Sequence, residues 1–220
     1  MKSYKLLSTL IFTSAVFGAF SPSSVFSQTV GTESSFEDVK LSSSVTVEDS
    51  GLKTELKSVS HGLRKKKVFG LIPVKVYVAE FFAKNPEKLK KTSDDILTSL
   101  KLSEAIQLKL TLSRNLSGTQ ITDSFKEALA ANKIDTEKTS KELTEVLSIL
   151  NKIEKFKTAE TFSISALWQK DDMATLIIQK PDGSTQKITG PGQFVTDLFS
   201  IWFGIPVDGK MEDLKKTLLK

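Results

Sequence analysis

The side chains best suited to chemistry cluster in one stretch of the sequence, HGLRKKKVFGLIPVKVYVAEFF at residues 61–82. It contains the only histidine of the chain, His61, four consecutive cations at residues 64–67, and Tyr77, the only tyrosine after residue 27. If the cations lie in a strand, alternate side chains point to opposite faces, so two fall on each side. The four cations therefore cannot form a single basic patch.

Arg64 is the cation with a reason to point inward. It shares its predicted face with Lys66 and with the apolar Val68, so this face could be the inner one. A buried Arg64 then needs an anionic partner, because removing one member of a buried ion pair costs about 3–5 kcal/mol. The alternative is that the whole run is solvated, and composition alone favours that alternative.

Tyr77 alternates with valines in the apolar run VKVYVAEFF and is predicted to share a face with Lys75 and Ala79. A buried phenol requires a hydrogen-bond partner, whereas an exposed one does not. The simplest interpretation is a core residue whose hydroxyl is satisfied.

Other kinds of chemistry find little support in the residue types. The chain has no cysteine, and no nucleophile motif surrounds His61. The acidic pairs at residues 94–95 and 171–172 occur in turn-like contexts typical of solvated side chains. The segment GPGQF at residues 190–194 lacks the Lys-Ser/Thr of a phosphate loop and suits a helix start. We therefore expect no metal site, no cofactor and no nucleophilic catalytic residue.

The N-terminus is typical of a secretory signal peptide. Lys2 and Lys5 precede an apolar stretch at residues 6–20, and small residues suited to cleavage follow at residues 25–27. The apolar stretch is shorter than the roughly 20 residues that span a membrane. We expect cleavage after residue 27 and export to a bacterial periplasm, or secretion.

The remaining composition predicts one ordinary globular domain. The chain has 220 residues, 39% of them hydrophobic and 26% charged. It has 31 basic residues, and the predicted signal peptide holds two of them and no acid, which leaves 29 against 26 acidic residues. This small excess argues against a nucleic-acid partner.

Periodicity predicts the fold class. Residues 28–50 are polar and are predicted as a flexible leader, with an edge strand only at residues 45–47. The domain at residues 51–220 begins with three predicted strands up to residue 82, one or two short helical turns, and a half-buried strand in the segment EAIQLKLTLSR at residues 104–114. Two amphipathic helices, further strands from residue 161 and two C-terminal helices follow. This order indicates an α+β fold, in which helices cover one face of an antiparallel sheet.

Three segments, GLRKKKVFGLIPVKVYVAEFF, LTLSRNLSGTQI and FVTDLFSIWFGIPVD, occur in an order that resembles the bacterial branch of the chalcone isomerase-like proteins. The resemblance covers about residues 52–219. It implies an open-faced β-sandwich, a large antiparallel sheet with helices packed on it and a ligand cleft between them. The family contains both isomerases that close a flavanone ring and fatty-acid-binding proteins without catalysis.

The resemblance also implies roles for individual residues. Arg64 matches an arginine common to both branches, and Tyr77 matches the tyrosine of the fatty-acid-binding members where isomerases have threonine. Ser200 matches a Ser/Thr position of the isomerases. Ile121 and Ala128 replace the isomerase's tyrosine and asparagine, so no catalytic residue is expected.

One further departure from the family concerns Glu80, which stands where the family often has a small residue. An acid at this position, close to Arg64, would compete with a ligand for that cation.

These expectations favour a non-catalytic binding protein for a fatty acid or similar carboxylate amphiphile, with Arg64, Tyr77 and Ser200 in the ligand site. One alternative is an isomerase, an intramolecular lyase, with altered acid-base residues. A further alternative is an adaptor that makes peripheral contact with an anionic membrane through Lys65, Lys67 and the lysines of residues 84–91. The oligomeric state is left open.

Overall fold

The computed structural model describes residues 29–30, 34–68 and 71–220, and the predicted signal peptide at residues 1–27 lies outside them. Its centre is an antiparallel sheet of eight strands in the order β1-β4-β5-β6-β7-β8-β9-β10. The strands are β1 (Thr29–Val30), β4 (Ser44–Asp49), β5 (Leu52–Val68), β6 (Ile72–Ala83), β7 (Ala105–Leu112), β8 (Thr161–Trp168), β9 (Met173–Gln179) and β10 (Thr185–Pro191).

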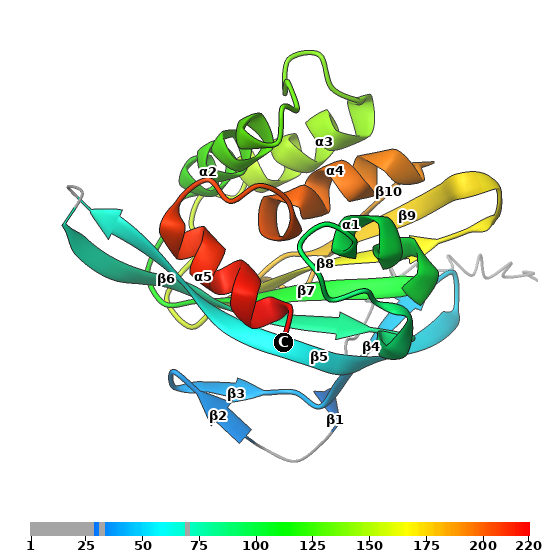
Figure 1. The fold of residues 1–220 in the computed structure, drawn as a ribbon, viewed down its shortest axis with the longest axis horizontal. Helices are drawn as coiled ribbons and strands as arrows, with labels where there is room; N and C mark the ends of the chain where they lie inside the picture. Colours follow the sequence, from blue (N-terminus) through cyan, green and yellow to red (C-terminus); the bar gives the residue numbers. More distant parts are fainter. Residues whose placement is uncertain (1–28, 31–33, 69–70) are drawn as a thin grey trace, which may run out of the picture.

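Helices cover one face of this sheet (Figure 1). They are α1 (Ile96–Ser99), α2 (Gly118–Ala131), α3 (Lys141–Asn151), α4 (Gly192–Phe203) and α5 (Gly209–Leu218), with short 3-10 turns at Pro86–Lys88, Leu100–Ser103 and Lys170–Asp172. The main core lies between helices and sheet, as the α+β prediction required. Within the described residues, no helix combines the length and apolar character needed to cross a bilayer.

The opposite face of the sheet is also covered, which the sequence analysis did not predict. The sheet curls so that Val45 and Val47 of β4 pack in a second apolar cluster with Phe82 and Ile177. A small hairpin of β2 (Ser34–Phe36) and β3 (Val39–Leu41) lies on the same side (Figure 1). Every residue of β7 except Lys109 is therefore buried, and the prediction of a half-buried strand was wrong.

The predicted flexible leader at residues 28–50 contains these same strands. The predicted edge strand at residues 45–47 is confirmed as part of β4, but β4 lies inside the sheet between β1 and β5. Val45 and Val47 are 1% and 3% exposed, so this part of the segment belongs to the folded domain rather than to a leader.

The three strands predicted between residues 52 and 82 are in fact two long ones, β5 and β6. β5 runs without a break through Gly62, which is extended within the strand. The missing side chain of Gly62 lets α5 approach closely, because a Cβ there would lie 2.8 Å from a methyl carbon of Leu214. The pairing of β5 with β6 instead contains two register shifts. At the second shift Arg64 pairs with Tyr77 but Lys65 pairs with Lys75, so Val76 is an extra, bulged residue.

Candidate ligand site

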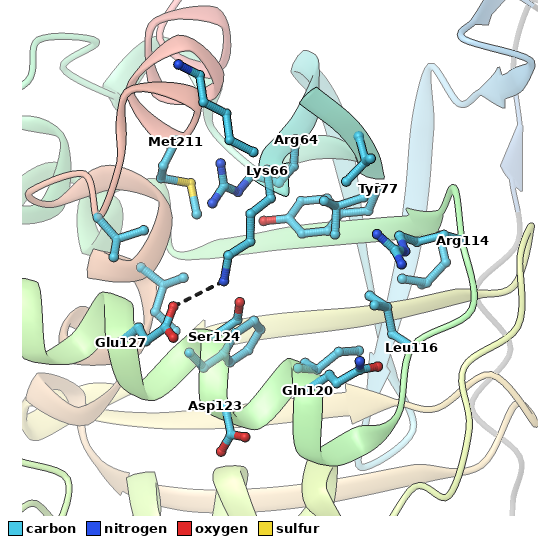
Figure 2. Close-up of a pocket in the computed structure, with 18 of the residues that line it drawn as sticks. Arg64, Lys66, Tyr77, Arg114, Leu116, Gln120, Asp123, Ser124, Glu127 and Met211 are labelled. Carbon is cyan, nitrogen blue, oxygen red and sulfur yellow. Dashed lines mark hydrogen bonds and ion pairs between the residues drawn. The ribbon is translucent and has the colours of Figure 1, made fainter. Parts of the chain in front are cut away.

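A cavity of about 420 Å³ lies between the helices and the sheet (Figure 2). It is at the end of the sheet where β5 and β6 extend beyond the neighbouring strands. Its volume is in the range of small-molecule sites. The buried part of its wall is mainly apolar and comes from five strands and helices, with Leu112, Ile121, Phe125, Phe162, Ile201 and Met211. Two buried polar side chains, Arg64 and Tyr77, interrupt this apolar wall.

The Val76 bulge brings valine and tyrosine to the same cavity. Without a bulge, neighbouring residues of a strand point to opposite faces, yet Val76 and Tyr77 both line the cavity. The prediction that Lys75 shares a face with Tyr77 was wrong. Lys75 instead forms an ion pair with Glu37 at the β2–β3 turn. The bulge therefore decides which side chains of β6 line the cavity.

Tyr77 presents a hydroxyl group whose proton no described residue accepts. Its side chain is 8% exposed, and its hydroxyl oxygen accepts a hydrogen bond from the indole Nε1–H of Trp202 at 3.1 Å. An indole N–H can only donate, so the phenol proton is not used in this contact. Burial raises the pKa of Tyr77 to about 12, although the positive charge of Arg64 opposes the shift. The group is therefore a neutral donor at physiological pH.

Arg64 points inward and is 4% exposed, which answers the question left open by its sequence position. Its guanidinium donates to both carboxylate oxygens of Asp208, at 2.8 and 2.7 Å, and to the main-chain oxygen of Lys65. A guanidinium has five N–H donors. Three of them donate to described residues. The charge of Arg64 is therefore neutralised by Asp208, and two of its N–H donors have no acceptor among the described residues.

Asp208 is held in place by the start of α5. It is the N-cap of this helix, and its Oδ1 also accepts from the amide of Met211 at 2.7 Å. Burial alone would raise the pKa of Asp208, but the hydrogen bonds from Arg64 and Met211 outweigh it and keep the pKa below its usual value. The close contact of α5 with Gly62 fixes the distance between the carboxylate and β5.

The mouth of the cavity carries exposed charges. Lys66 of β5 forms an ion pair of 3.2 Å with Glu127 of α2, which joins the two sides of the opening (Figure 2). Lys67 and Arg114 also line the cavity, and neither forms an ion pair with any described residue. In Figure 2 Arg64 and Met211 lie at one end of the space and Arg114 at the other.

The structure brings Arg64 and Tyr77 together as cross-strand neighbours, but it places Ser200 elsewhere. Ser200 is buried in α4, is not among the cavity-lining residues, and its hydroxyl donates to the main-chain oxygen of Asp197 at 2.6 Å. Ile121 does face the cavity, so an apolar side chain stands at the position that the resemblance assigns to a catalytic tyrosine.

Glu80 is not the acid near Arg64. Its side chain lies on the other face of the sheet, where it accepts from the amide of Ser42 at 2.8 Å and pairs with Lys109 at 2.9 Å. The acid that contacts Arg64 is Asp208, 144 residues away in the sequence. Its position before Gly209-Lys210 is a recognisable helix-cap signal, but no sequence signal indicates which strand it meets. Trp202 was likewise missed as the partner of Tyr77.

Comparison with solved structures identifies the fold. A crystal structure of a fatty-acid binding protein from Arabidopsis thaliana matches 79% of this chain and 97% of its own, with a TM-score of 0.53 and 15% sequence identity. The curled antiparallel sheet with its helices is the chalcone isomerase-like fold of that protein. Neither family profiles nor curated protein sequences match this chain.

Proposed function

We propose that this protein binds a fatty acid or a similar carboxylate amphiphile in the cavity beside Arg64 and Tyr77, without chemical conversion. The observation that carries the proposal is an apolar cavity of about 420 Å³ whose inner wall presents one buried cation and one phenol proton. The similar solved structure is itself described as a fatty-acid binding protein, which supports the same ligand class.

The ligand's carboxylate accepts a hydrogen bond from the Tyr77 hydroxyl and shares the Arg64 guanidinium with Asp208. The bidentate contact uses one N–H of each terminal nitrogen, and donors remain on the guanidinium for a second acceptor. A charge-assisted hydrogen bond contributes about 1.5–3 kcal/mol. Because Asp208 already neutralises Arg64, we expect the headgroup contribution to lie at the lower end of this range.

The alkyl chain supplies most of the affinity. Burial contributes about 0.8 kcal/mol per methylene, so a chain of about ten carbons outweighs one headgroup contact. The apolar wall of Leu112, Phe125 and Phe162 suits such a chain. The headgroup contacts then set the orientation of the ligand more than its affinity.

The proposal is tested by extracting the purified protein with organic solvent and identifying bound molecules by mass spectrometry. Ile121→Trp fills the cavity from α2, and Ala130→Trp adds the same side chain to an exposed position of that helix. We expect a co-purifying carboxylate amphiphile in the wild type and in Ala130→Trp, and its depletion in Ile121→Trp. An empty wild type, or equal loading of all three proteins, contradicts the proposal.

We propose further that binding takes place in the periplasm after removal of residues 1–27. The support is the basic start and apolar stretch of the N-terminal sequence. Cell fractionation followed by N-terminal sequencing tests this location. A cytosolic protein that begins at Met1 refutes it and leaves the ligand proposal intact.

A further inference from the structure

The hairpin of β5 and β6 extends beyond the rest of the sheet as a two-stranded arm (Figure 1). β4 pairs with β5 only over Leu52–Lys57, and β7 pairs with β6 only from Tyr77 onward. Residues 65–68 and 72–75 therefore pair in the sheet only with each other. Such an arm has the reach to contact a partner outside the domain.

The end of this arm is both apolar and basic. Leu71 is 82% exposed and Ile72 is 62% exposed, and they are two of the five exposed large hydrophobic residues in the described part of the chain. Lys65 and Lys67, a few residues away on the other strand, form no ion pair with any described residue. We call these four residues the arm tip.

The arm that carries the arm tip also forms one side of the cavity mouth. Lys66, Lys67, Val74 and Val76 of the same arm line the cavity. Whatever surface the arm tip meets therefore lies next to the opening through which a ligand enters or leaves.

We propose that the arm tip docks on an anionic phospholipid bilayer, with Leu71 and Ile72 in the interfacial region and Lys65 and Lys67 on the lipid headgroups. Exposed apolar side chains flanked by cations are complementary to such a surface, because burial of the apolar groups and attraction to the negative headgroups act at the same place. The inference goes beyond ligand binding, since it assigns the surface on which the cavity opens.

The lysines of residues 84–91 belong to a different surface. They begin at the far end of β6, about 40 Å from the arm tip when measured along the strand at roughly 3.3 Å per residue. Lys84 and Lys88 are also paired with Glu104 at 2.6 and 3.1 Å. The membrane contact expected from the sequence therefore reduces to the arm tip.

A single labelled cysteine tests the docking directly, because the chain has no cysteine of its own. Leu71→Cys, labelled with an environment-sensitive fluorophore, should brighten and shift to the blue when vesicles of phosphatidylcholine and phosphatidylglycerol are added. Leu52→Cys is the control, because Leu52 is 74% exposed at the opposite end of β5. Its label should not respond. Equal responses at both positions, or none at Leu71→Cys, overturn the proposal.

Vesicle flotation of unlabelled protein separates the contribution of the apolar side chains to membrane binding from that of the lysines. The Leu71→Ser/Ile72→Ser variant should lose roughly tenfold or more in partition coefficient, and Lys65→Ser/Lys67→Ser roughly tenfold at low salt. Lys138→Ser/Lys141→Ser removes two exposed cations elsewhere and should bind like the wild type. Binding that is equal on pure phosphatidylcholine, or indifferent to salt, contradicts the role of the lysines. These measurements require no cavity ligand, so their outcome is independent of the proposed function.

Discussion

The carboxylate of Asp208 meets the guanidinium of Arg64 through two hydrogen bonds, although 144 residues separate them in the sequence. One partner lies in β5 and the other caps α5, so the contact ties the last helix to the wall of the cavity. The side-chain exposures are 5% for Arg64 and 36% for Asp208, so the acid is the more accessible partner. Asp208 does not line the cavity, so in the proposed complex a ligand's carboxylate reaches Arg64 from the cavity and shares the guanidinium with Asp208.

Replacement of Asp208 by asparagine should strengthen fatty-acid binding. Asparagine preserves the helix cap and removes the charge that competes for Arg64. We expect roughly tenfold tighter binding of a fatty acid by calorimetry, the scale of one weakened charge-assisted hydrogen bond. Asp213→Asn, an exposed acid of α5 paired with Lys210, is the control and should change nothing. Weaker binding by Asp208→Asn would refute the competition.

The contribution of Arg64 to ligand binding can be isolated in the Asp208→Asn variant. Arg64→Met alone would leave Asp208 without its partner, whereas Arg64→Met with Asp208→Asn removes both charges together. Relative to Asp208→Asn, the double variant should bind a fatty acid at least tenfold more weakly and its methyl ester unchanged, as measured by calorimetry. Equal losses for acid and ester would show that the substitution acts on packing instead.

Tyr77→Phe removes the phenol proton and leaves the indole N–H of Trp202 without its acceptor. We expect the free energy of unfolding to fall by about 1–3 kcal/mol in denaturant titrations, the cost of an unsatisfied buried donor. Fatty-acid affinity should fall about fivefold or more in calorimetry. Trp202→Phe shares the stability loss but leaves the phenol in place, so it should retain the greater part of the affinity.

Alkaline titration of protein without residues 1–27 reports on the burial of Tyr77, because Tyr77 is the only tyrosine after residue 27. Burial raises its pKa to about 12, so tyrosinate absorbance should stay absent through pH 10 in the folded protein. The folded state then holds its proton more tightly than the unfolded chain. Stability therefore declines as the pH rises above about 10, the ordinary pKa of tyrosine. A folded protein that titrates near pH 10 would contradict the buried position.

Acid titration tests the Arg64–Asp208 pair. The pKa of Asp208 is lower in the folded protein than its usual value, so the stabilisation is fully present above about pH 4. It is lost as the pH falls through the depressed folded value. The difference in free energy of unfolding between the wild type and Asp208→Asn should therefore shrink below about pH 4 in denaturant titrations. A difference that stays constant to lower pH would contradict the shift.

Local patterns in the sequence were sufficient for most of the fold. The helical spacing around Phe125 and Leu147 predicted α2 and α3, and the strict alternation of Ile106 to Leu112 predicted β7. The burial of the second face of β7 could not be predicted, because it depends on the curl that brings β4 across the sheet. Gln107 is polar and would be expected to face solvent from the sequence alone. In the structure it is 2% exposed and donates a hydrogen bond to the buried hydroxyl of Ser165.

The candidate site was predictable only where it depends on local sequence patterns. Alternation and the resemblance both drew attention to Arg64 and Tyr77, which do line one cavity. Alternation failed at Val76, because a bulge depends on the pairing of two strands and leaves no mark in either one alone. The Asp208 contact is a long-range consequence of how closely α5 packs on Gly62. Whether Arg64, Tyr77 and Ser200 bind a ligand stays a prediction.

The central claim, that the cavity takes a carboxylate amphiphile, is tested most directly by calorimetric titration of the delipidated wild-type protein. Dodecanoic acid and its methyl ester present the same chain with and without the charged headgroup. The account predicts saturable binding of both, with the acid bound about tenfold more tightly through Arg64 and Tyr77. No binding of either compound, or equal binding of the two, would contradict it.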